Sequence, residues 1–116
     1  MKVDVTYKYI QNSKLLEEIL DKNISKIDKR LVGLAKYDAI RTSIHIEKNP
    51  HRNQYFCRSH IYLPSKVIKA ENSSNDAIKA INLNFSALIR QLDRLKYKLV
   101  KHLSSHKNKH LGQFKS

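Results

Sequence analysis

The spacing of apolar residues changes three times along this chain, and these changes limit the folds that it can adopt. Residues 2–8 alternate between polar and apolar side chains, as in a strand with one buried face. Residues 14–31 and 76–103 carry apolar side chains every three or four positions, as in helices with one buried stripe. Residues 38–71 return to alternation. The pattern predicts a strand, a helix, three strands and a second helix.

Local signals mark the ends of both predicted helices. Ser13 is suited to cap the first helix, because a side-chain oxygen at that position can accept a hydrogen bond from a free helical amide. Gly33 is suited to end the same helix. Asn75 or Asp76 can cap the second helix, which is expected to run to about Leu103 because neither Gly nor Pro interrupts it.

Turn-forming residues divide the central segment into strands. The first of its three strands carries Ile40, Thr42, Ile44 and Ile46 on one face, and residues 48–54 then form a turn. A second strand, residues 55–63, ends at Pro64, and a short third strand covers residues 67–70. The polar segment 71–76 is expected to be a linker. The three strands are predicted to form an antiparallel meander.

The apolar stripes of the two helices predict how the elements pack. A sheet with one apolar face must cover that face, and two helices of this length are sufficient. The sequence therefore predicts an α+β fold of order β-α-β-β-β-α, with one four-stranded sheet and both helices on one face. The expected helix contacts are Leu16, Leu20, Ile24, Ile27 and Leu31 in the first helix, and Ile81, Phe85, Leu88, Leu92, Leu95, Leu99 and Leu103 in the second. We expect one domain, residues 1–103, and a basic, mobile C-terminal tail, residues 104–116.

The net charge of the chain points to a polyanionic partner. Lysine and arginine number 23 against 10 acidic residues, which gives a formal net charge of +13. A field of this sign suits nucleic acid or an anionic membrane. A membrane-lying helix needs a free apolar face, and here both apolar stripes are predicted to cover the sheet. The membrane is therefore excluded as a partner, and nucleic acid is favoured.

The compartment is predicted from cysteine use and from the apolar runs. Cys57 is the single cysteine, so an internal disulfide cannot form, and a reducing compartment fits best. The N-terminal residues lack the apolar run of a signal peptide, and no apolar run has transmembrane length. We expect a soluble, cytoplasmic protein.

Basic side chains lie opposite both apolar stripes. Once the stripes are buried, the basic faces of the two helices are expected to point outward on the same side of the molecule, where they would bind phosphates. Lys96 is nearer the flank of this surface than the others. The predicted phosphate-binding residues, named here the two-helix surface, are Lys22, Lys26, Lys29, Arg90, Arg94, Lys96, Lys98 and Lys101.

Three histidines near the C-terminus are considered as metal ligands. His102, His106 and His110 are spaced four apart and would share one face of a continuing helix. No carboxylate or thiol lies near them in the sequence, so we favour added affinity for RNA over metal binding, and we expect neither a metal nor a cofactor.

Side chains of the predicted strands could also carry chemistry. His45 and His60, on neighbouring strands, could together with Glu47 form the acid–base pair of a small ribonuclease, but alternation alone places such residues on an exposed sheet face. Cys57 is most simply a small buried apolar residue. Tyrosines at positions 55, 62 and 97 could stack on bases, but packing within the sheet or helix is favoured.

Residues 76–99, DAIKAINLNFSALIRQLDRLKYKL, resemble the second helix of the ribosome hibernation promoting factor and ribosome-associated inhibitor family. Segments 3–6, 25–28 and 46–48 resemble other parts of the same family, so the resemblance covers roughly residues 2–103. No long C-terminal extension follows, so the resemblance is to a short form. The residues that carry it in the second helix are Asp76, Ala80, Ile81, Leu88, Arg90, Gln91, Leu92, Arg94, Lys96 and Lys98.

The sequence departs from the family pattern at three positions of the second helix. Ile78 stands where the family commonly has Tyr, and Ala87 and Leu95 stand where members often have Lys and His. The resemblance therefore carries no contact over to these three positions.

The resemblance implies a ribosome-binding translation inhibitor, or hibernation factor, and no enzymatic activity. Its implied partners are the small ribosomal subunit with its rRNA and whole ribosomes, where it would occupy the channel of mRNA and of A-site and P-site tRNA. No small-molecule substrate is implied, and we expect a monomer when free. Two alternatives stay open: a general double-stranded-RNA-binding protein, whose fold is similar without the first strand, and a small ribonuclease.

Overall fold

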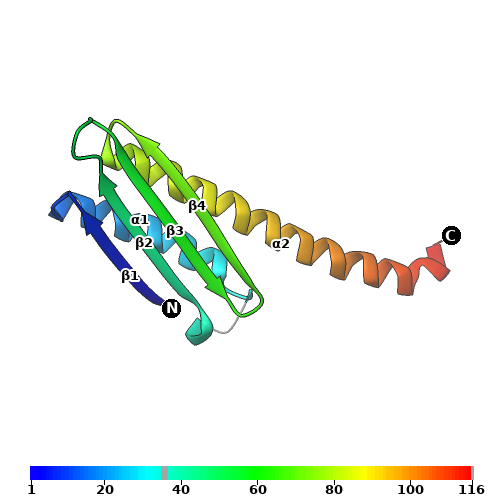
Figure 1. The fold of residues 1–116 in the computed structure, drawn as a ribbon. Coiled ribbons are helices and arrows are strands. Elements are labelled where there is room, and N and C mark those ends of the chain that lie inside the picture. The colour runs from blue at the N-terminus through cyan, green and yellow to red at the C-terminus, as the bar shows by residue number, and fades with distance from the viewer. Residues whose placement is uncertain (35–36, 116) are drawn as a thin grey trace.

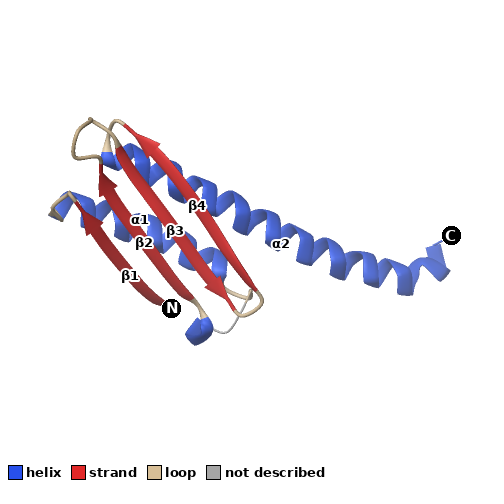
Figure 2. Ribbon diagram, viewed as in Figure 1, coloured by secondary structure: helices blue, strands red, loops and turns tan. Residues whose placement is uncertain are grey.

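The protein folds into two layers, a four-stranded sheet and a pair of helices that cover one of its faces (Figure 1). The computed structural model describes residues 1–34 and 37–115, and the side chains of residues 1–34 and 38–99. The order of elements is β-α-β-β-β-α, with one turn of 3-10 helix before β2 (Figure 2). The predicted fold class is confirmed.

The sheet has the strand order β1-β2-β3-β4. β1 pairs with β2 in parallel, and α1 connects them, while β2, β3 and β4 form the predicted antiparallel meander. Each strand alternates between a face turned to the helices and an open face turned away from them. The strands are β1 (Lys2–Lys8), β2 (Arg41–Lys48), β3 (Tyr55–Leu63) and β4 (Lys66–Ser74).

The helix ends follow the predicted signals. In α1 (Lys14–Leu31), the Ser13 hydroxyl accepts a hydrogen bond from the Leu16 amide at 3.1 Å. Gly33 follows this helix with a φ of 85°, a left-handed conformation that suits glycine. α2 (Ala77–Lys115) is capped by Asp76, whose carboxylate accepts from the Ile78 amide at 3.2 Å.

The core lies between the sheet and the two helices. Ile44, Ile46 and Ile61 from the sheet, and Phe85 and Leu88 from α2, are at most 1% exposed. Burying an apolar side chain of this size contributes about 1.5–3 kcal/mol to folding. Cys57 is fully buried among them, as predicted, and burial raises the pKa of its thiol to about 12.

Two element boundaries differ from the prediction. Residues 71–74, expected to be a linker, belong to β4, because Tyr55 to Arg58 at the start of β3 supply partners for them. α2 continues to Lys115, beyond the predicted end near Leu103, and projects past the sheet (Figure 1). Leu99 is 44% exposed, so its predicted packing on the sheet is wrong. The side chain of Leu103 lies outside the described residues.

Candidate nucleic-acid interface

Both helices present cations away from the sheet. Lys22, Lys26 and Lys29 of α1 are exposed, as are Arg90, Arg94, Lys96 and Lys98 of α2. The side chain of Lys101 lies outside the described residues. Among the described side chains the members of the two-helix surface form no salt bridge, so their charges are available to a ligand.

A groove of about 240 Å³ separates α1 from α2 and holds two of the predicted cations. Lys22 and Lys26 lie on its α1 side, with Asn23 between them. The Asn23 amide donates to the Ile19 carbonyl at 2.8 Å and to the Asn82 side chain on α2 at 3.1 Å. The groove thus combines ammonium groups with amides, which suits phosphate and sugar oxygens.

A second cleft, of about 160 Å³, lies on the other side of α2, against β4. Arg94 and Lys98 line it together with Lys66 of β4 and Gln91. The Gln91 side chain donates to the Lys69 carbonyl at 2.7 Å and so attaches α2 to this edge of the sheet. Three cations from two elements meet here, and Arg94 can bind a phosphate through two nitrogen atoms.

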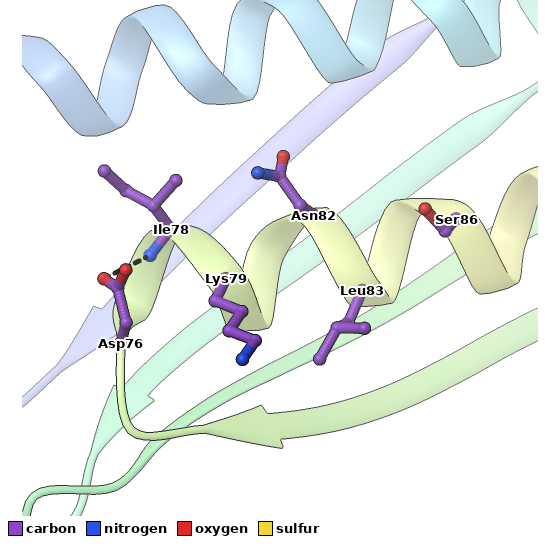
Figure 3. Close-up of a pocket in the computed structure, with 6 residues that line it drawn as sticks. All are labelled: Asp76, Ile78, Lys79, Asn82, Leu83 and Ser86. Atoms are coloured by element: carbon purple, nitrogen blue, oxygen red, sulfur yellow. Dashed lines mark hydrogen bonds between the residues drawn. The ribbon is translucent and has the colours of Figure 1, made fainter.

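The outer side of α2 forms a ridge between the groove and the cleft, and this ridge carries Arg90. Arg90 follows Ser86 by four residues and is exposed on the outer side of α2. An open pocket of about 310 Å³ lies along the same ridge near the start of α2 (Figure 3). It is lined by Lys79 as well as Ser86, so this ridge carries a cation about three turns before Arg90.

The two helices approach one another near these cations. Arg30 of α1 and Asp93 of α2 form a salt bridge at 3.2 Å, and Arg30 also donates to the Lys26 carbonyl. Lys96 follows Asp93 by three residues and so lies on the α1 side of α2. An exposed pair such as Arg30–Asp93 contributes only about 0–1 kcal/mol, so it marks where the two helices approach one another and adds little to holding them together.

Acidic side chains gather on the far side of α1, beside β1. Partial burial of Tyr7, followed by the charges of Glu17 and Asp21, raises the pKa of its hydroxyl. Cations on one side of α1 and carboxylates on the other give the molecule a charge asymmetry. The side of α1 that carries the two-helix surface is therefore more attractive to a polyanion than the side beside β1.

Of the residues considered for a ribonuclease, His45 contacts Glu47, whereas His60 contacts a different partner. The His45 ring contacts the Thr6 hydroxyl at 2.7 Å and the Glu47 carboxylate at 3.0 Å, and this hydrogen bond lowers the pKa of Glu47. His60 stacks on Tyr62 instead. Both histidines lie on the open face, but they contact different partners.

The described residues offer neither a metal cluster nor a membrane span. No group of three or more His, Cys, Asp or Glu side chains in that part of the chain is arranged to hold a metal ion. His102, His106 and His110 lie outside the described side chains. Neither helix has, over its described residues, the length and apolar character needed to cross a bilayer.

Two residues of the candidate interface were missed from the sequence. Lys66 lies just before the predicted third strand of the meander, and no binding role was predicted for it. Asn23 lies on α1, where the apolar pattern does not predict a buried amide that contacts the second helix. Their roles depend on α2 lying beside both elements, which periodicity does not reveal. The three positions that depart from the family pattern, Ile78, Ala87 and Leu95, pack partly against the core.

Comparison with known proteins agrees with this architecture. Residues 3–100 match the family model described as Sigma 54 modulation protein / S30EA ribosomal protein, whereas a search of curated proteins gave no match. A ribosomal subunit interface protein from Coxiella burnetii has a similar structure, with a TM-score of 0.66 and 22% identity over 84% of this chain and 99% of its own.

A second solved structure is equally similar in fold. The N-terminal domain of Protein Y from Thermus thermophilus gives a TM-score of 0.66 with 12% identity, over 82% of this chain and 99% of its own. At these identities the two structures speak for the fold alone. The family match spans most of the chain and confirms the resemblance drawn from residues 2–103. The protein therefore belongs to the Sigma 54 modulation protein / S30EA ribosomal protein family.

Proposed function

We propose that the protein is a hibernation factor that binds the small ribosomal subunit and inhibits translation without performing chemistry. In this proposal the two-helix surface contacts rRNA phosphates, and the bound protein occupies the channel of mRNA and of A-site and P-site tRNA. The observation that carries the proposal is the family match over residues 3–100, on a chain whose two helices carry exposed cations.

The fixed arrangement of the cations supports binding to a folded RNA. Arg30–Asp93 and Asn23–Asn82 join the two helices, and Gln91 joins α2 to β4. The spacing between the α1–α2 groove and the α2–β4 cleft is therefore set before binding, which reduces the entropy lost on association. Folded RNA is recognised largely by its shape and by the positions of its phosphates, which suits such a surface.

Co-sedimentation with ribosomes tests the proposal directly. The protein is expected to travel with small subunits and whole ribosomes at low salt, and to inhibit translation in a cell extract. Equal affinity for free duplex RNA, with translation untouched, would favour a general double-stranded-RNA-binding protein instead. Cleavage of RNA during the incubation would favour a ribonuclease.

Charge reversal tests the two-helix surface. The triple variant Lys26→Glu, Arg90→Glu, Arg94→Glu is expected to lose binding to small subunits, because each substitution replaces an attraction to phosphate with a repulsion. A matched variant, Lys8→Glu, Lys14→Glu, Arg52→Glu, removes the same charge from exposed positions elsewhere and is expected to keep most of the binding. Far-UV circular dichroism checks that both variants fold. Equal binding by the two variants would contradict the proposed surface.

A further inference from the structure

The open face of the sheet divides into two halves of different chemistry. At the end where β1 finishes, polar side chains contact one another: Thr6 and Glu47 with His45, and Arg58 with Glu71 at 3.1 Å. The charges in this half are therefore largely paired within the protein. Figure 1 is viewed onto this face, with both helices behind the sheet.

The other half, where β1 and β2 begin and β3 ends, is aromatic and basic. The Arg41 guanidinium lies over the Tyr62 ring, 4.7 Å from its centroid. The His60 ring stacks on Tyr62 with centroids 5.9 Å apart and an angle of 15° between the planes. Arg41 and Tyr62 are register partners on β2 and β3, so backbone pairing holds this stack in place.

Further side chains complete this half, which is named here the Tyr62 patch and consists of Lys2, Arg41, His60, Tyr62, Val67 and Lys69. Lys2 pairs with Arg41 in the register of β1 and β2, and Val67 and Lys69 pair with Tyr62 and His60 in that of β3 and β4. Val67 is 42% exposed. Among the described residues, Lys2, Arg41 and Lys69 form no salt bridge, in contrast to Arg58 in the other half.

We propose that the Tyr62 patch binds single-stranded RNA, with bases adding to the stack of Arg41, Tyr62 and His60 while Lys2 and Lys69 contact phosphates. Aromatic rings and guanidinium planes on an exposed surface are the groups on which unpaired bases stack. In a duplex the bases are already stacked on one another, so this patch favours a single strand. The proposal does not rest on the proposed ribosomal function, which uses the opposite face.

The patch continues around the edge of the sheet to the α2–β4 cleft. Successive residues of β4 point to opposite faces, so Lys66 and Ile68 line the cleft while Val67 and Lys69 lie on the open face. A single strand that crosses the exposed edge of β4 can therefore contact Lys66 on one side and Lys69 on the other. The protein then has two RNA-binding faces that meet at one strand.

An oligonucleotide without bases separates stacking from phosphate binding. We suggest measuring, by fluorescence anisotropy, the binding of a single-stranded RNA of about eight nucleotides and of an abasic strand of equal length. Full-length protein with Lys26→Glu and Arg90→Glu reduces the contribution of the two-helix surface. The strand with bases is expected to bind at least about five-fold more tightly than the abasic strand.

Substitutions on the open face test whether the Tyr62 patch causes this difference in affinity between the two strands. Tyr62→Leu, and separately Arg41→Ala, whose side chain is exposed, are expected to reduce the difference to less than about two-fold, because stacking on the patch supplies it. Lys8→Ala, in the other half of the same face, is expected to leave it unchanged. Equal affinity for the two strands, or the same effect from Arg41→Ala and Lys8→Ala, would overturn the proposal.

Two further measurements distinguish RNA binding at the patch from attraction to an acidic protein and from binding to the ribosome. Polyglutamate is expected to compete poorly against the strand with bases, and equal competition would identify an acidic protein partner and overturn the RNA assignment. Tyr62→Leu is expected to co-sediment with small subunits as the unmodified protein does. If Tyr62→Leu loses base-dependent binding but still co-sediments with small subunits, the result supports RNA binding at the patch. If the unmodified protein shows base-dependent binding but does not co-sediment with small subunits, only the ribosomal proposal is contradicted.

Discussion

The buried amide of Asn84 joins α2 to the two strands beneath it. Its side-chain nitrogen donates to the Cys57 carbonyl at 2.8 Å and to the Ala70 carbonyl at 3.0 Å, and its oxygen accepts from the Ser59 hydroxyl. Asn84 is 0% exposed, so water cannot replace these bonds. The amide therefore fixes the height of α2 on β3 and β4, and with it the positions of Arg90 and Arg94.

Replacing Asn84 with Ala is expected to lower the free energy of unfolding by about 2–4 kcal/mol, because it leaves several buried polar groups without a partner. Ser86→Ala, two residues away on the same helix, is the control and is expected to cost less than about 1 kcal/mol, since Ser86 is exposed. Urea unfolding measures both. Equal costs would show that the buried network does not hold α2.

The thiol of Cys57 gives the folded state a specific alkaline sensitivity. Burial raises its pKa from 9.0 to about 12, so the stability contributed by the protonated thiol is complete below pH 9 and is lost as the pH rises toward 12. In that window the unmodified protein is expected to lose about 1.4 kcal/mol per pH unit relative to Cys57→Ala. Urea unfolding at several pH values checks this, and parallel curves for the two proteins would refute it.

At the scale of elements, α2 has two parts with different neighbours. Up to Leu92, which is 1% exposed, its apolar side chains lie against the sheet, whereas Leu99 is 44% exposed. A 39-residue helix spans about 58 Å, more than the length of any strand beneath it. The apolar stripe therefore extends past the surface that it was expected to cover.

This division predicts unequal costs for the same substitution. Leu92→Ala is expected to lower the free energy of unfolding by about 2–5 kcal/mol, because it leaves a cavity between α2 and the sheet. Leu99→Ala is expected to change it by about 0.5 kcal/mol or less. Chemical denaturation of the two variants decides the point, and a large cost at Leu99 would mean that this part of α2 is covered.

Element types could be predicted because one buried face leaves a period in the sequence. Alternation of polar and apolar residues predicted β1, β2 and β3, and helical spacing predicted both helices. Ser13 and Gly33 correctly marked the two ends of α1. The second half of β4 was missed because Asn72 and Ser74 occupy its helix-facing positions, where a strand signal requires apolar side chains. Its pairing with β3 is a tertiary effect that one segment does not encode.

The candidate site could be predicted in composition but not in arrangement. The cations of both helices were found because they lie opposite the apolar stripes. That Lys26 borders the α1–α2 groove while Arg94 meets Lys66 of β4 depends on how α2 lies across the sheet. Arg41 and Tyr62 lie on different strands, so their contact could be predicted only from the register of β2 and β3.

At the scale of the whole molecule, charge determines how binding responds to salt. If six to eight cations contact phosphates, the logarithm of the binding constant is expected to fall with the logarithm of salt concentration with a slope of about −4 to −7. Lys22→Ala with Lys29→Ala is expected to make the slope shallower by about 1–2. Sedimentation with small subunits over a potassium chloride series measures it, and binding insensitive to salt would contradict a phosphate interface.

The position of α2 in the chain has a consequence for synthesis. Ile81, Phe85 and Leu88 cover β3 and β4 from a helix that is translated after all four strands. A nascent chain that has reached only β4 contains all four strands but not the helix that completes the layer over their apolar face. Until α2 emerges, the growing polypeptide exposes Ile61 and Ile68, and so depends on prompt completion or on a chaperone to avoid aggregation.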